Sequence, residues 1–300
     1  MGSRQTTSFL MRRFESAGIR PDHRRGQNFL TDLNLLALLA DSAEIDRQDL
    51  VLEIGTGLGS LTALLARRAA GVVTVEVDQR LHQLAAEQLL EQTNVTLLLH
   101  DALRNKNNLD ARIMDEVRAA MERHGATRFK LVANLPYNIA TPVVSNLLSV
   151  TPIPASMTVT IQKELADRMV ASPGSKDYSA LSIWLQCQCR TSIIRIMPPS
   201  VFWPRPKVHS AIVQIVPVPE MRAEVGDLPF FHGFVRSVFI HRRKFLRASL
   251  VSAYGREMSK QDVDTLLEDQ GLKHQIRAEE LEVAALLKLS RAVQQRLAAK

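Results

Sequence analysis

The stretch Leu50-Val-Leu-Glu-Ile-Gly-Thr-Gly-Leu-Gly-Ser60 decides the fold of this chain. Its apolar first half is typical of a buried strand and runs directly into Gly55, Gly57 and Gly59. A helix-compatible run, Leu61–Ala66, follows. Glycines at a strand–helix junction allow a tight turn and let a ligand approach the backbone closely. The stretch therefore predicts a ligand-binding loop at a strand end, and a glycine-rich turn without a ligand is the alternative.

The spacing Gly-x-Gly-x-Gly differs from the Gly-x-Gly-x-x-Gly of dinucleotide enzymes, in which a pyrophosphate lies on the helix N-terminus. It favours a cofactor without phosphates, and S-adenosylmethionine is the leading candidate. The next strand, Val72–Val77, carries Glu76, which can hold the ribose hydroxyls of an adenosine-containing cofactor. A third strand, Val95–His100, brings Asp101 to the same edge, where it can accept from an adenine amine. A lone Asp after a strand is more often a turn former or a helix cap.

A further strand ends within Leu131-Val-Ala-Asn-Leu-Pro-Tyr-Asn-Ile-Ala-Thr141. Ligands of open α/β sheets bind at such carboxyl ends. The side-chain carbonyl of Asn134 and the main-chain carbonyl of Leu135 both accept hydrogen bonds, which suits an exocyclic amino group. Tyr137, after Pro136, offers a face on which a planar base can stack. The candidate catalytic residues are therefore Asn134, Leu135, Pro136 and Tyr137, and an ordinary strand-ending turn is the alternative.

The chain resembles the ribosomal RNA small-subunit adenine dimethyltransferases of the KsgA type, from near Gln27 to its C-terminus. The resemblance rests on separated motifs in the family's order, which argue against chance convergence. They are Gly26-Gln-Asn-Phe-Leu30, Glu53-Ile-Gly-Thr-Gly-Leu-Gly59, Glu76-Val-Asp78, Asp101-Ala-Leu103, Asn134-Leu-Pro-Tyr137, Gln162-Lys-Glu164, Phe202-x-Pro-x-Pro-Lys-Val208, Arg242-Arg-Lys244 with Leu246-Arg247, and Arg277-Ala-Glu-Glu-Leu281.

The resemblance implies an α/β fold: a Rossmann-like S-adenosylmethionine-dependent methyltransferase sheet with a small C-terminal helical domain. It implies N6,N6-dimethylation of adenines in small-subunit ribosomal RNA, linked to small-subunit assembly, with that RNA or the pre-assembled subunit as partner. The cofactor site that it implies consists of Asn28, Leu30, Gly55, Glu76, Asp101 and Asn134, and the loop adds Gly57 and Gly59. The chain departs from the family pattern at His100, Ser179-Ala180, His209 and Ala248, which replace the usual Gly, Gly-Arg, Asp and Asn.

The composition is consistent with an enzyme that binds nucleic acid. Lys and Arg exceed Asp and Glu by 38 − 31 = 7 in 300 residues, and the sequence pI is about 9.7. Basic residues crowd the tail 1–24, which we expect to bind RNA or to be disordered. Others lie on a predicted C-terminal helix, where Arg243 and Arg247, or Lys244 and Arg247, share a face. The candidate substrate-binding residues are Tyr137, Phe202, Arg242, Arg243, Lys244 and Arg247, and a solvated basic face is the alternative.

Strands and helices alternate along the chain, which predicts a mainly parallel, doubly wound sheet. After a helix at Asp32–Ser42, strands are expected near 50–54, 72–77, 95–100, 129–134 and 157–162. A short Pro-rich connection joins the strands 191–196 and 210–216, so we expect an antiparallel hairpin at the sheet edge. We divide the chain into a tail 1–24, a catalytic domain 25–219 and a helical RNA-binding domain 220–300, with helices at Phe230–Val251, Ser259–Gln270 and Ala278–Leu297.

The segment 104–128 is longer than a plain connection needs. Its apolar residues Leu109, Ile113, Val117 and Met121 indicate an inserted amphipathic helix, which we interpret as a solvated surface decoration.

Cys187 and Cys189 have no companion pair, so the sequence predicts packing residues and no metal site or disulfide framework.

The N-terminus has no apolar signal core, and no run approaches the length of a membrane span. The Arg-rich composition of the N-terminus resembles that of an organellar transit peptide, but we expect the protein to be cytoplasmic. We also expect it to be a monomer.

An adenine amine is a poor nucleophile because its lone pair is delocalised into the ring. Acceptors at Asn134 and Leu135 would hold it in a more tetrahedral state, while Tyr137 and Phe202 stack on the base from its two sides. Three rivals stay open: a large-subunit rRNA methyltransferase that confers macrolide resistance, a non-catalytic assembly or transcription factor, and a small-molecule or protein-glutamine methyltransferase. The Arg277-Ala-Glu-Glu-Leu281 region argues against the first, the intact glycines and Asn134 against the second, and the basic segments against the third.

Overall fold

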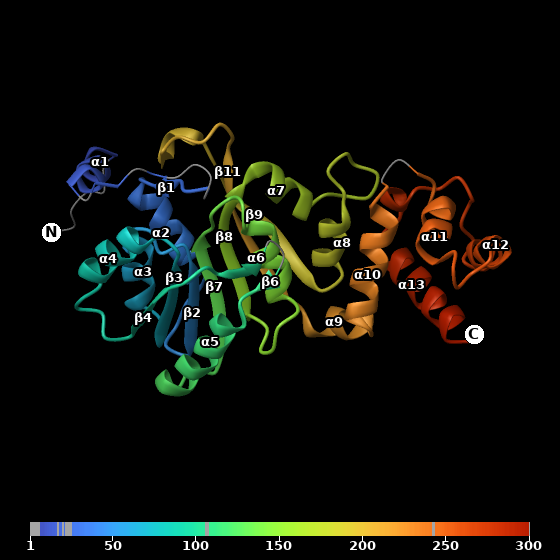
Figure 1. Cartoon of the computed structure of the whole chain (residues 1–300), viewed down its shortest axis with the longest axis horizontal. Coiled ribbons are helices and arrows are strands. Elements are labelled where there is room, and N and C mark those ends of the chain that lie inside the picture. The colour runs from blue at the N-terminus through green and yellow to red at the C-terminus, as the bar shows by residue number, and fades with distance from the viewer. Residues whose placement is uncertain are drawn as a thin grey trace. The chain divides into compact units, whose positions relative to one another are not determined.

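The protein is described by a computed structural model that covers residues 7–16, 18–19, 21, 26–105, 108–241 and 244–299 (Figure 1). Its contacts divide the chain into two compact units. The first comprises Met1–Ala166 and Ser192–Pro217, and the second comprises Asp167–Thr191 and Val218–Lys300. The segment Asp167–Thr191 therefore groups with the C-terminal helices, whereas the sequence places it in the domain 25–219.

The first unit is built on a sheet of strand order β4-β3-β2-β7-β8-β11-β9. The pairs β2–β3, β3–β4, β2–β7 and β7–β8 are parallel, and β11 is antiparallel to β8. The strands are β2 (Asp49–Ile54), β3 (Gly71–Glu76), β4 (Val95–Leu99), β7 (Arg128–Asn134), β8 (Ser156–Gln162), β9 (Cys189–Met197) and β11 (Ser210–Pro217). The expected, mainly parallel doubly wound sheet is confirmed.

The direction of strand addition reverses at the centre of this sheet. The chain places β3 and β4 on one side of β2 and then returns to place β7 and β8 on the other side. In open α/β sheets, ligands bind outside the carboxyl ends of the strands at such a switch point. The ends of β2 and β7, Ile54 and Asn134, lie there, directly before the glycine loop and the Asn-Leu-Pro-Tyr motif.

Aspartate side chains cap the N-termini of two helices of the first unit, α2 and α4. Asp32 accepts hydrogen bonds from the first-turn N–H groups of α2, and Asp78 does the same for α4. The apolar faces of α2 and α3 pack on the sheet in one core with Val51, Val72 and Val132. The helices are α2 (Leu33–Asp41), α3 (Ser60–Ala66), α4 (Gln79–Gln88), α5 (Ala111–His124) and α6 (Ala140–Leu147), which follow the blue-to-green part of the chain (Figure 1).

Helix α5 corrects our interpretation of the segment 104–128. It buries Ile113, Met114, Val117 and Ala120 and contacts β2, β3 and β7. It therefore covers the sheet, and the interpretation as a solvated surface decoration is wrong. The physical reason is topological: a chain that leaves β4 and returns as parallel β7 needs a crossover, and a helix packed on the sheet usually provides it. A small pair of strands, β5 (Leu103–Asn105) and β6 (Asn108–Leu109), precedes it.

The expected strand pair at the sheet edge is present, because β9 lies at the edge beside β11. The connection between them holds the short strand β10 (Phe202–Trp203), which pairs antiparallel with β1 (Phe29–Leu30). This pairing ties the segment just after the N-terminal tail to the far end of the first unit's sequence.

The second unit is mainly helical. Its C-terminal helices α10 and α13 share a core that includes Phe231, Phe234 and Leu289, and Cys187 and Cys189 are buried as expected. The apolar run Phe230–Val251 forms two helices, because the chain turns between Phe239 and Leu246. The helices are α7 (Lys163–Met169), which leads into the unit, α8 (Ala180–Gln186), α9 (Pro219–Val225), α10 (Leu228–Phe239), α11 (Leu246–Tyr254), α12 (Lys260–Asp269) and α13 (Val283–Ala298).

Candidate active site

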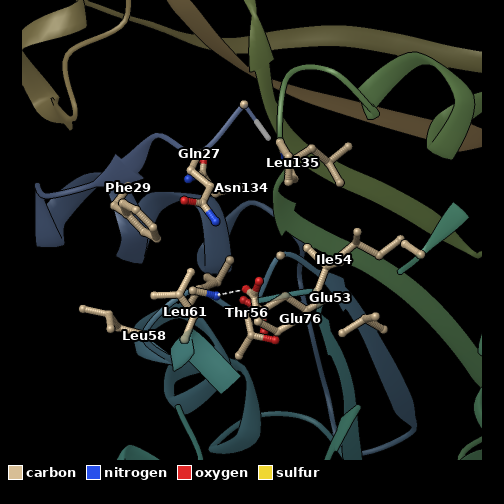
Figure 2. A pocket seen from close by; sticks show the side chains of 18 of the residues that line it. Gln27, Phe29, Glu53, Ile54, Thr56, Leu58, Leu61, Glu76, Asn134 and Leu135 are labelled. Atoms are coloured by element: carbon tan, nitrogen blue, oxygen red, sulfur yellow. Dashed lines mark hydrogen bonds between the residues drawn. The ribbon is translucent and has the colours of Figure 1, made fainter. Parts of the chain in front are cut away.

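A pocket opens at the carboxyl ends of β2, β3 and β7 and encloses about 920 Å³ including its open mouth. Figure 2 shows Phe29, Glu76 and Asn134 around it, each from a different segment of the chain. Of the residues proposed from sequence, the pocket is lined by Asn28, Leu30, Gly55, Gly57, Glu76, Asp101, Asn134, Leu135 and Pro136.

The glycine loop forms the floor of the pocket with its backbone. Gly57 has φ +58°, and a Cβ there would lie 3.2 Å from Cε1 of Phe29, another pocket residue. A side chain would therefore fill space that a ligand can use. Gly59 is the N-cap residue of α3 and does not line the pocket. Any effect of Gly59 on a ligand in the pocket is therefore indirect.

Glu76 is held in the pocket by backbone donors. Its Oε2 accepts from the N–H of Gly57 and its Oε1 from the N–H of Asp78, both at 2.9 Å. The side chain is 4% exposed, and this burial raises its pKa, while the backbone hydrogen bonds work in the opposite direction. Each carboxylate oxygen keeps a lone pair for a further donor, such as a ligand hydroxyl.

Asp101 combines the two roles that its sequence position suggested. It lines the pocket, and its Oδ1 accepts from the N–H of Leu103 at 2.9 Å. It is exposed, so the turn-forming contact and a ligand contact at the other oxygen are compatible.

Glu53 is a pocket residue that was not among our candidates. It is 1% exposed, and its Oε2 accepts from the hydroxyls of Thr62 and Thr74 at 2.5 and 2.7 Å. Burial raises its pKa to about 8 against the opposing effect of these hydrogen bonds, and the nearby Glu76 raises it further. The available signal was an acid inside an otherwise apolar strand, two residues before Gly55.

Asn134 presents an unused acceptor. Its Nδ2 donates to the main-chain carbonyl of Asn28 at 2.8 Å, which fixes the orientation of the amide. Its Oδ1 is buried and, within the part of the chain that the structure describes, has no hydrogen-bond partner. The neighbouring peptide is also fixed, because the N–H of Leu135 donates to the carbonyl of Thr160 at 3.1 Å. A buried acceptor without a partner is costly unless a ligand supplies the donor.

The segment 26–30 crosses the Asn-Leu-Pro-Tyr motif closely. Gly26 has φ +66°, and a Cβ there would lie 2.9 Å from the backbone N of Tyr137 and from Oδ1 of Asn138. Asn28 closes the turn by donating from Nδ2 to the Gly26 carbonyl at 3.1 Å. These close contacts explain why the first residue of the Gly26-Gln-Asn-Phe-Leu30 motif is a glycine.

Tyr137 and Phe202 occupy different environments. Tyr137 is half-buried and is not among the residues that line the pocket, and its hydroxyl lies 2.5 Å from Oγ of Ser210. Phe202 is 4% exposed and packs in the core with Leu30 and Ile212. A ring without exposed surface cannot stack on a base, so the structure contradicts the role of Phe202 as a second stacking platform. Its pairing with Leu30 in β1–β10 is the physical reason.

The chain matches a known protein family over most of its length. The model of the ribosomal RNA adenine dimethylases matches residues 20–295. The chain belongs to the ribosomal RNA adenine dimethylase family. Ribosomal RNA small subunit methyltransferase A of Pediococcus pentosaceus is 37% identical over 281 residues, which cover 93% of this chain and 92% of that protein. The protein of the same name from Streptococcus uberis is 40% identical over 272 residues, or 90% and 91% of the two chains.

Solved structures support the same fold. A dimethyladenosine transferase from Plasmodium falciparum has a TM-score of 0.74 at 24% identity and covers 89% of this chain and 98% of its own. The 23S rRNA methyltransferase ErmE has a TM-score of 0.62 at 25% identity and covers 89% of this chain and 100% of its own. The Rossmann-like methyltransferase fold is thereby confirmed.

The basic segment of this dimethylase does not form the expected continuous helix. His241 and Lys244 lie in the turn between α10 and α11, while Arg242 and Arg243 lie outside the described residues. Arg247 is on α11, where its Nε and Nη2 donate to the two carboxylate oxygens of Asp264. The prediction of one basic helical face is wrong, because α11 begins only at Leu246. Arg247 is engaged within its own unit.

Part of the basic tail is structured. Helix α1 (Thr7–Ser16) is anchored by Phe14, which is 1% exposed and packs edge-on against Phe29 and Trp203 at 5.0 and 4.9 Å between ring centroids. Of the two expectations for the tail, disorder is therefore wrong for α1, while RNA binding stays a prediction. Arg20, Arg24 and Arg25 lie outside the described residues.

The departures from the family pattern fall in four environments. His100 lines the pocket, with Nε2 3.1 Å from Oδ2 of Asp110. Ser179 caps α8, while Ala248 is exposed on α11. His209 is exposed, and its carbonyl accepts from the N–H of Lys163 at 2.9 Å. None of them touches the free acceptor of the Asn-Leu-Pro-Tyr motif.

Within the described residues, no three His, Cys, Asp or Glu side chains are grouped so that they could hold one metal ion. Likewise, none of the helices assigned to these residues has the length and apolar character needed to cross a membrane.

Proposed function

We propose that this protein is an S-adenosylmethionine-dependent enzyme that dimethylates N6 of adenines in small-subunit ribosomal RNA, as part of small-subunit assembly. It acts as a cytoplasmic monomer on that RNA or on the assembling subunit. The observation that carries the proposal is the buried Oδ1 of Asn134, an acceptor at the edge of the pocket for which the described residues supply no donor.

The residues of the pocket fit the cofactor. The side-chain-free backbone of Gly55 and Gly57 lets a ligand approach closely, and Glu76 offers carboxylate lone pairs for ribose hydroxyls. Asp101, at the end of the next strand, accepts from the adenine amine, and Asn28 and Leu30 cover the site. The bound cofactor supplies an activated methyl electrophile.

The protein's own contribution is to hold the target amine. Asn134 Oδ1 and the Leu135 carbonyl accept hydrogen bonds from N6–H, and so they draw the amine toward a tetrahedral, more nucleophilic geometry. Asn28 holds the Asn134 amide before substrate arrives, and Thr160 holds the N–H of Leu135, in the peptide that precedes the second acceptor. Well-oriented reactants can gain roughly 7–11 kcal/mol from positioning. The second methylation requires the monomethylated amine to turn and present its remaining N–H to the same acceptors.

The target base must leave its stack to reach this site, at a cost of a few kcal/mol. Tyr137 is the stacking platform that offsets this cost, since base–aromatic stacking is worth roughly 1–3 kcal/mol per base. With Phe202 buried in the core, we assign stacking to Tyr137 alone. RNA phosphates bind to the exposed Lys244 and to its sequence neighbours Arg242 and Arg243, which lie outside the described residues.

The likeness to ErmE favours one rival, methylation of large-subunit RNA. The test incubates the purified protein and S-adenosylmethionine with each ribosomal subunit from a strain that lacks the modification, followed by mass spectrometry of RNA nucleosides. We expect N6,N6-dimethyladenosine only in small-subunit RNA. Product confined to large-subunit RNA would favour the rival. Binding to the subunit without any product would favour the non-catalytic assembly factor.

A further inference from the structure

The hydroxyl of Tyr137 is tied to a strand 73 residues later in the chain. It lies 2.5 Å from Oγ of Ser210, and either atom can be the donor. Ser210 is 0% exposed and is the first residue of β11, paired in register with Gln162, the last residue of β8. Because β11 is antiparallel to β8, its start lies at the edge of the sheet where β7 and β8 end. Ser210 and the Asn-Leu-Pro-Tyr motif therefore share that edge.

The contact restrains a ring that would otherwise rotate. Tyr137 is half-buried, so one part of the ring is available to a base while its hydroxyl end is held. A side chain that is fixed before binding loses less conformational freedom when it stacks. The backbone of the same turn lies close to Gly26, where an added Cβ would be 2.9 Å from the Tyr137 nitrogen, so the hydroxyl contact adds to a closely packed turn.

We propose that Ser210 is a positioning residue for methyl transfer, which holds the Tyr137 ring in the orientation that stacks on the flipped adenine. This inference rests on the proposed function and adds a residue to it. Ser210 touches neither substrate nor cofactor and acts only through the Tyr137 hydroxyl. A serine that merely fills its place in the core would have no such dependence on Tyr137.

A double-mutant cycle tests this dependence with Tyr137→Phe, Ser210→Ala and the double variant. Single-turnover methyl transfer to the unmethylated small subunit is measured at saturating S-adenosylmethionine. We expect each single variant to be slower by about threefold to tenfold, the usual value of one hydrogen bond. The double variant should be no slower than either single variant. The KM for the subunit should change little, because phosphate contacts dominate RNA affinity.

Ser156→Ala is the matched control. Ser156 is also a buried serine that opens a strand, but it opens β8 at the opposite edge of the sheet, in register with Lys130. It should transfer methyl groups at the wild-type rate. Wild-type rates for Tyr137→Phe and Ser210→Ala, or losses that add in the double variant, would overturn the inference.

A second measurement does not depend on methyl transfer. RNA that carries 2-aminopurine at the target adenine reports stacking by quenching of its fluorescence, and Tyr137→Phe and Ser210→Ala should reduce the quenching equally. Equal quenching in wild type and both variants would also overturn the inference. A wild-type protein that transfers no methyl group to either subunit would overturn the proposed function instead, and thermal melting shows whether each variant is folded.

Discussion

The side-chain amide of Asn134 donates from Nδ2 to the main-chain carbonyl of Asn28 at 2.8 Å, across 106 residues of chain. This contact uses the nitrogen of the amide, so Oδ1 is the atom that remains to accept a hydrogen bond from a ligand. The segment that carries Asn28 also lines the pocket. The wall of the proposed cofactor site and the proposed acceptor for the target amine are therefore parts of one arrangement.

Asn134→Ala removes the free acceptor and should leave a folded protein that still binds the small subunit. A hydrogen bond to a group that gains charge is worth roughly 1.5–3 kcal/mol, so we expect single-turnover transfer to slow by about 10- to 150-fold. Asn138, which is exposed in the same turn and does not line the pocket, provides the control Asn138→Ala. Equal transfer rates for Asn134→Ala and wild type would remove Asn134 from the mechanism.

Gly26→Ala should impair both stability and activity. A Cβ at Gly26 would lie 2.9 Å from the Tyr137 backbone, in addition to the strain of φ +66°. Gly125→Ala is the control, because Gly125 has φ +65° and open space around its Cβ. The control should cost about 1–2 kcal/mol of unfolding free energy and keep full activity. If denaturant melts and methyl transfer show no difference between the two variants, the close crossing of the two segments is unimportant.

Glu76→Ala should weaken S-adenosylmethionine binding in a folded protein. The ribose hydroxyls would lose charge-assisted hydrogen bonds worth roughly 1.5–3 kcal/mol each, so the dissociation constant should rise at least about tenfold. Glu76→Gln keeps the size of the side chain and one carbonyl oxygen, and its affinity should lie between those of Glu76→Ala and wild type. Isothermal titration calorimetry measures all three. An unchanged affinity in folded Glu76→Ala would exclude Glu76 from the cofactor site.

Glu53 should make stability depend on pH. Its folded-state pKa is raised from 4.5 to about 8, chiefly by burial. Between these two values the native state keeps a proton that the unfolded chain has released. The contribution of protonated Glu53 to the free energy of unfolding is therefore fully present below pH 4.5, and it is lost as the pH rises through about 8. Glu53→Gln cannot ionise. Its melting temperature relative to wild type should therefore increase between about pH 5 and pH 9, and a difference that is constant with pH would contradict the prediction.

Lys244 and Arg247, which follow α10, should differ in how their substitution by alanine affects RNA binding and melting temperature. Lys244 is exposed, so Lys244→Ala should reduce the slope of log affinity against log salt by about 0.7–0.9, with no change in melting temperature. Arg247 is paired with Asp264, so Arg247→Ala should lower the melting temperature. Its salt slope should equal that of wild type. A reduced slope for Arg247→Ala in a stable protein would restore Arg247 to the RNA-binding surface.

The sequence by itself determined the sheet and the location of the site. Apolar runs of strand length that alternate with helical segments produce parallel strands whose carboxyl ends meet at one edge. Any residue that directly follows such a run, such as Gly55 or Asn134, is therefore placed there without knowledge of the tertiary contacts. Glu76 is placed by the same rule. These features depend on local periodicity and turn chemistry, which a single stretch of chain contains.

Only the tertiary structure decided which side chains are used and which are covered. The acceptor of Asn134 is free because Asn28 takes its donor, and Arg247 is engaged because Asp264 faces it. Phe202 is buried in the core, where its strand pairs with the strand of Leu30. Burial and hydrogen bonding arise between elements that are distant in sequence, and a pattern within one element contains no information about the surface that will face it.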